Sequence, residues 1–217
     1  MSQLRRFSTG EEIANSISHG IGFFLAIAGM VILLVKGYRY GTAWHLVAYS
    51  IYGATMILLF LSSTINHSLR FGIKAKDVFH NIDQVAIFLF IAGTYTAFAL
   101  TSLRQHGGWI MFGIEWGLAL TGLVIKFSIP NKFEQGVNMF YIASFVIMGW
   151  LVLFYIRPVV DQMSVRALTF LVAGGLCYTL GIIFYRTKKI PYAHLLWHLS
   201  VIGGCFLHWW VVFKFTT

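Results

Sequence analysis

The sequence predicts an all-α membrane protein, a bundle of seven transmembrane helices. Hydrophobic residues make up 58% of the 217 residues and charged residues only 11%, whereas a soluble domain has roughly 25% charged residues. The chain cannot hide so much apolar surface in its own interior, so bilayer lipid is its natural solvent. It has only three prolines and no Ser- or Gly-rich linker, which indicates a single domain over residues 1–217.

Apolar runs of about 20 residues follow one another along the chain, and each is long enough to cross a bilayer as a helix. Only helices fit, because a backbone within lipid must satisfy its own hydrogen bonds. Polar breaks such as KGYRYG, RQHGG, RPVVDQMS and RTKKIP separate the runs. The predicted spans are Ser16–Val35, Trp44–Ile65, Val85–Leu103, Trp109–Phe127, Val137–Tyr155, Val165–Tyr185 and His194–Phe215.

Basic residues are distributed unevenly between the two sides of this bundle, and the positive-inside rule turns that bias into an orientation. Ten of the 16 Lys and Arg residues fall on the side of the N-terminus and six on the other side. We therefore expect the N-terminus in the cytoplasm and the C-terminus outside. The net charge of +9 is scattered between apolar runs, which predicts contact with lipid head groups and no nucleic-acid binding.

Polar side chains gather at one depth, near the predicted cytoplasmic ends of four spans. Ionisable groups within a membrane are costly unless they are paired or coordinated, so such clustering favours a functional site. The residues are Glu12, Asn15 and His19 in the first span, Ser63 and His67 in the second, His80 and Asp83 in the third, and His194 and His198 in the seventh.

The histidine spacing predicts a metal site. His194 and His198 are four residues apart, so both imidazoles project from one helix face and can hold one ion. His67 would supply a third nitrogen. Neutral imidazoles suit zinc, and a tetrahedral ion would keep a fourth position for water, which Asp83 could orient. The histidine pair could instead hydrogen-bond across the bundle, and the spacing alone leaves that alternative open.

Other polar residues in the spans carry less information. His208 lies ten residues beyond His198, roughly 15 Å along a helix, so it cannot bind the same ion. We expect it to be a packing residue or a polar group in the outer leaflet. Glu115 is expected to find a hydrogen-bond partner in the bundle or to approach the outer interface. Cys177 and Cys205 both lie in apolar runs and are expected to be small buried side chains without a disulfide.

These residues, in this order, resemble the hemolysin III family, the bacterial branch of the progestin and adipoQ receptor family. The resemblance covers nearly the whole chain, and its specific parts are EEIANSISHG, ILLFLSSTINH, DQVAIFLFIAGTYT and IPYAHLLWH. It implies a seven-helix fold in a bacterial plasma membrane, with the N-terminus inside. One departure is visible, because family members often have proline after GTYT and this chain has Ala97, which removes a helix kink from the third span.

The resemblance also implies a set of site residues. It assigns a zinc ion near the cytoplasmic leaflet to three histidine ligands, with two further side chains lining the site and three more in an N-terminal motif of less clear role. In this chain the ligands are His67, His194 and His198, the lining residues are Ser63 and Asp83, and the motif residues are Glu12, Asn15 and His19.

Three functions remain open at this stage. The first is a zinc-dependent intramembrane hydrolase of a lipid amide or ester, as in the alkaline ceramidases that the family is similar to, with Asp83 as general base and Ser63 as an oxyanion donor. The second is a non-catalytic regulator of membrane fluidity with structural zinc, and the third a channel or cytolysin. The expected partners are membrane lipids, including a lipid substrate or a free fatty acid.

Overall fold

The structure, a computed structural model, describes residues 7–128, 134–187 and 189–216. These residues form helices and the turns between them, and no strand occurs among them. Within these ranges, seven helices are long and apolar enough to cross a membrane: Thr9–Tyr40, Ala43–Ser68, Lys74–Ala99, Arg104–Ser128, Met139–Gln162, Val165–Arg186 and Ala193–Phe215. The seven-helix prediction is therefore confirmed, and the chain is a multi-pass integral membrane protein.

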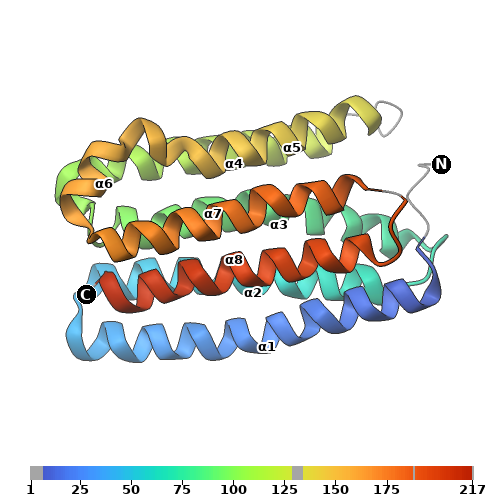
Figure 1. Cartoon of the computed structure of the whole chain (residues 1–217), viewed down its shortest axis with the longest axis horizontal. Helices are drawn as coiled ribbons and strands as arrows, with labels where there is room; N and C mark the ends of the chain where they lie inside the picture. The colour runs from blue at the N-terminus through green and yellow to red at the C-terminus, as the bar shows by residue number, and fades with distance from the viewer. Residues whose placement is uncertain (1–6, 129–133, 188, 217) are drawn as a thin grey trace.

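Five spans are single helices and two are compound. The single helices are α1 (Thr9–Tyr40), α2 (Ala43–Ser68), α3 (Lys74–Ala99), α7 (Val165–Arg186) and α8 (Ala193–Phe215). The compound spans are η1 (Arg104–Gly108) followed by α4 (Trp109–Ser128), and α5 (Glu134–Trp150) followed by η3 (Leu151–Tyr155) and α6 (Ile156–Gln162). The helices lie side by side along one axis, and α1 begins at the end of the bundle opposite to the end of α8 (Figure 1).

Helix α1 begins seven residues before the apolar run that predicted it, because a capping box starts it. The Ser8 hydroxyl accepts a hydrogen bond from the backbone N–H of Glu11 at 3.2 Å, and the Glu11 carboxylate accepts from the backbone N–H of Ser8 at 2.9 Å. This reciprocal pair satisfies donors that a helix start leaves free. As a result Glu12, Asn15 and His19 all lie within the helix.

The fifth span continues further than predicted, since the segment RPVVDQMS is mostly helical. Pro158 falls in the first turn of α6, where a helix does not need its missing N–H. The Tyr95 hydroxyl donates to the carbonyl of Gly149 at 3.1 Å and accepts from the N–H of Val152 at 2.9 Å, which supports the backbone where α5 changes into η3. Helix α3 itself runs unbroken past Ala97, as the absence of proline there predicts.

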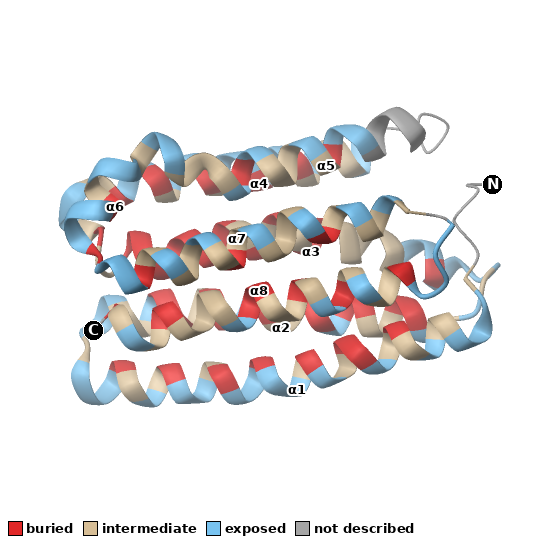
Figure 2. Cartoon of the chain, viewed as in Figure 1, coloured by how far each residue is buried: buried red, intermediate tan, exposed pale blue. Residues whose placement is uncertain are grey.

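Small residues allow α1, α2 and α3 to pack closely. A Cβ atom at Gly53 would lie 2.4 Å from the Met30 side chain, and one at Gly93 would lie 2.1 Å from Thr55. Close approach over small residues is the usual packing mode of membrane helices. Figure 2 shows a buried stripe along α1 with exposed residues on its opposite side. That exposed side is apolar, with Phe24 70% exposed, as a lipid-facing surface requires.

Candidate metal centre

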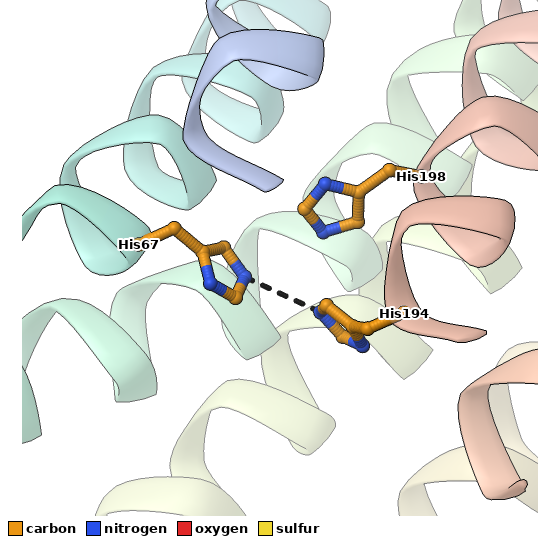
Figure 3. Close-up of side chains that lie close together, drawn as sticks. All are labelled: His67, His194 and His198. Atoms are coloured by element: carbon orange, nitrogen blue, oxygen red, sulfur yellow. Dashed lines mark hydrogen bonds between the residues drawn. The ribbon is translucent and has the colours of Figure 1, made fainter. Parts of the chain in front are cut away.

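The first turns of α1, α3 and α8 and the last turns of α2 meet at one end of the bundle, and three histidines converge there. His67 lies near the end of α2, and His194 and His198 lie one turn apart at the start of α8. One ring nitrogen from each lies within 4.8 Å of those of the other two. The Nε2 atoms of His67 and His194 are 3.2 Å apart (Figure 3).

A partly buried carboxylate, that of Glu12, holds His67 in place. The Nδ1 atom of His67 donates to Glu12 Oε2 at 2.5 Å, and Glu12 Oε1 accepts from Lys76 Nζ at 3.1 Å. Lys76 is only 4% exposed and also donates to the backbone carbonyl of Asn66 at 2.6 Å. With its Nδ1 proton committed to Glu12, neutral His67 has its free lone pair on Nε2, which faces the other histidines.

His198 is oriented in the same way by α1. Its Nδ1 atom lies 3.1 Å from the Ser18 hydroxyl and 3.2 Å from the backbone carbonyl of Asn15. The Ser18 hydroxyl donates its own proton to that carbonyl at 2.8 Å, so both oxygens can only accept from His198. This fixes the proton of neutral His198 on Nδ1 and leaves the Nε2 lone pair for a ligand. The His19 ring stacks on the His198 ring with a centroid distance of 3.5 Å.

Asp83 and Ser63 lie at the same end, on α3 and α2. Asn66, the residue before His67, donates from Nδ2 to Asp83 Oδ2 at 2.9 Å. The Ser63 side chain also contacts the Asp83 carboxyl and is 1% exposed. Ser63 precedes His67 by four residues, which places both on one face of α2. The structure thus gathers all the site residues predicted from the sequence at one end of the molecule.

Three residues of this network were missed by the sequence analysis: Ser18, Asn66 and Lys76. Lys76 is one of the ten basic residues counted on the N-terminal side to predict the orientation. It does share a helix face with Asp83, seven residues later, and this i, i+7 spacing is the signal that could have identified it. Ser18 and Asn66 carry no comparable signal, because each acts through one contact with a residue from another helix.

His208 and Glu115 lie outside the site. His208 donates from Nε2 to the carbonyl of Leu171 at 3.0 Å and packs against Tyr178. The hydrogen-bond partner expected for Glu115 is absent: the residue is 0% exposed, and neither carboxylate oxygen has a hydrogen-bond partner among the described residues. On the facing helix α3, the Thr96 hydroxyl already donates to the carbonyl of Ala92 and the Tyr95 hydroxyl donates to the carbonyl of Gly149.

The donor set suits zinc. Two nitrogens of a tetrahedral zinc site lie roughly 3.3 Å apart for Zn–N bonds of about 2.0–2.1 Å, and the His67–His194 separation of 3.2 Å matches that value. Carboxylate or carbonyl partners on the remote ring nitrogens, as His67 and His198 have here, are typical of metal-binding histidines. The same Nε2–Nε2 distance also fits a direct hydrogen bond between the two rings when no ion is bound.

Comparison with known proteins identifies the family. Residues 7–209 match the family model described as Haemolysin-III related. The chain is 40% identical over 204 residues to Hemolysin-3 of Bacillus cereus, covering 94% of this chain and 90% of that protein. It is 42% identical over 198 residues to the Hemolysin-3 homolog of Bacillus subtilis, covering 91% of each. The human monocyte to macrophage differentiation factor is 29% identical over 216 residues, covering 94% of this chain and 84% of that protein. The chain therefore belongs to the hemolysin III family.

Proposed function

We propose that this protein is a zinc-dependent intramembrane hydrolase that cleaves a lipid amide or ester in a bacterial plasma membrane and thereby contributes to membrane-lipid homeostasis. The observation that carries the proposal is the convergence of three imidazoles. In two of them, a protein oxygen holds the Nδ1 atom on the side of the ring away from the cluster. His67 is held by Glu12, and His198 by Ser18 and the carbonyl of Asn15. Such orienting contacts are typical of metal-binding histidines.

The residues divide into a metal-binding set and a proton-transfer set. His67, His194 and His198 would hold the ion, and the chemistry that zinc supplies at such sites is Lewis-acid activation of water and of a carbonyl group. Asp83 would accept a proton from the water that attacks the lipid carbonyl carbon. It would return that proton to the nitrogen or oxygen of the leaving group as the carbonyl–heteroatom bond breaks, which gives a fatty acid and an amine or alcohol.

Ser63 would assist in the same step. Its hydroxyl contacts Asp83 and lies on the face of α2 that carries His67. From there it would donate a hydrogen bond to the carbonyl oxygen as negative charge develops on it, and donors of this kind act strongly where water is excluded. At 1% exposure, Ser63 lies in such a region.

Asp83→Asn tests this proposal directly. The amide preserves size and much of the hydrogen bonding to Asn66 but cannot act as a base, so the variant should keep its fold and its zinc. We expect hydrolysis to fall by about 10²–10⁴-fold, the usual contribution of general-base catalysis. The measurement is fatty acid released from ceramides and phospholipids in reconstituted bilayers. Equal release by wild type and variant, or no metal-dependent release by the wild type over that panel, would contradict the proposal.

A non-catalytic role with structural zinc is the second candidate, and one contact favours it. The Phe7 ring lies 4.8 Å from the His194 ring and 5.9 Å from the His67 ring, so this residue covers part of the cluster. A channel has no such support, because the hydrogen bonds of the described residues form no continuous path from Asp83 to His208 or Glu115.

A further inference from the structure

His194 is the most accessible of the three histidines in the cluster. His67 and His198 are buried, at 5% and 1% exposure, whereas His194, in the first turn of α8, is only partly buried. A metal ion or a water molecule that enters the cluster from the end of the bundle therefore passes His194. Any residue that covers this ring controls access to the site.

Two aromatic side chains lie against His194. The Phe7 ring centroid is 4.8 Å from that of His194 and 5.9 Å from that of His67, and the Tyr185 centroid is 5.8 Å from that of His194. Tyr185 belongs to α7, so its backbone is fixed by the helix. Phe7 lies outside the helices, directly before the N-cap of α1. Of these two rings, Phe7 is the one that can move away.

The sequence at the start of α1 explains why Phe7 turns toward the cluster. An apolar residue before the N-cap commonly packs against the fourth residue of its own helix. Ser8 is the N-cap here, so that fourth residue is Glu12, whose carboxylate binds His67 and Lys76. The first turn of α1 therefore offers no apolar partner at the usual position, and the Phe7 ring lies against the histidines of the neighbouring helices.

Glu11 anchors the chain next to Phe7. Its Oε2 atom accepts from the backbone N–H and the hydroxyl of Ser8 at 2.9 and 3.0 Å, and its Oε1 atom accepts from the backbone N–H of Tyr192 at 3.1 Å. Tyr192 has a φ of 56°, which is unfavourable for a bulky residue and needs such support. One carboxylate thus joins the start of α1 to the turn that leads into His194, and Phe7 can leave His194 while both helices stay in place.

We propose that Phe7 is a lid on the histidine cluster, which opens to admit water and the metal ion to His194 and closes over the site afterwards. This inference rests on the proposed function, because a hydrolase must admit water to its metal. The lid blocks entry and exit alike, so it slows both without changing the equilibrium affinity for zinc. Opening exposes an apolar ring to water, which keeps the open state at roughly 10% or less of the population.

The first test measures zinc exchange in full-length protein in alkyl maltoside micelles. Transfer of zinc to an excess of a chromogenic chelator should be about 10-fold faster for Phe7→Ala than for wild type. Zinc uptake by the metal-free variant should be faster by the same factor, which leaves the equilibrium affinity within about twofold of wild type. Phe7→Trp keeps an aromatic ring and should exchange zinc at nearly the wild-type rate. Phe154→Ala removes a ring that is 90% exposed in η3 and should have no effect.

The second test needs no metal. Diethyl pyrocarbonate modifies accessible neutral imidazoles, and mass spectrometry of peptides measures the rate at His194 in metal-free protein. Phe7→Ala should raise that rate about 10-fold, since the same lid opening controls both processes. His106, an exposed histidine in η1, should react at an unchanged rate and serves as the internal control.

Unchanged zinc exchange or unchanged modification of His194 in Phe7→Ala would overturn the lid. Faster zinc release matched by an equal loss of affinity would also overturn it, because Phe7 would then stabilise the bound ion and would not block its path. A wild type that binds no zinc would contradict the proposed function. In that case faster modification of His194 in Phe7→Ala would still support the lid, and an unchanged rate would overturn it.

Discussion

Hydrogen bonds to Nδ1 orient His67 and His198 so that Nε2 of each ring is available to a metal ion. Each uses Nδ1 for a protein oxygen, supplied by Glu12 in one case and by Ser18 and Asn15 in the other. Both Nε2 lone pairs are then free to bind a ligand within the histidine cluster. The spacing of the histidines and their depth could be predicted from the sequence. The oxygens that hold their Nδ1 atoms could not be assigned, because all of them come from α1, whereas the histidines lie on α2 and α8.

Glu12 should contribute to zinc affinity through His67. Glu12→Gln removes the charge that His67 and Lys76 share, and loss of such an orienting partner typically weakens metal binding by about 10–100-fold. Competition with a chelator of known affinity measures the change. Asp77→Asn is the matched control, since it removes an exposed acid at the same end of the molecule. Equal zinc affinities for the two variants would show that Glu12 does not act on the ion.

At the scale of helices, the sequence predicted the number and order of the spans, whereas the positions where helices begin, end or bend depended on local and tertiary contacts. Apolar length was enough to define seven runs. The start of α1 was missed because Ser8 and Glu11 cap it outside the apolar run. The change from α5 to η3 was missed because Tyr95, on α3, binds the backbone at that point. No pattern within residues 134–162 encodes that contact.

At the scale of the whole molecule, the start of α8, which carries His194 and His198, lies at one end of the bundle, and the last turn of α8 lies at the other (Figure 1). Which end faces the cytoplasm remains a prediction from charge. One of the ten basic residues on the N-terminal side, Lys76, is buried against Glu12 and cannot contact head groups. Without Lys76 the count is nine basic residues against six, so the charge bias keeps its sign.

A reporter fused after Thr217 tests this orientation. With the C-terminus outside, a reporter that is active only outside the cytoplasm should be active in this fusion, and one that is active only in the cytoplasm should be silent. Fusions within the loop that contains Arg186 should give the opposite pattern, which serves as the internal control. The reversed result for both would move the histidine cluster to the outer leaflet.

Zinc content distinguishes a metal site from a direct His67–His194 hydrogen bond, since a separation of 3.2 Å between the two Nε2 atoms fits both. Elemental analysis of purified protein after dialysis should give about one zinc per chain. His194→Ala combined with His198→Ala should abolish it. His45→Ala combined with His106→Ala, which removes two histidines from the opposite end, should leave it unchanged. A wild type without zinc, or a His194/His198 double variant that keeps it, would contradict the assignment of this site to a metal.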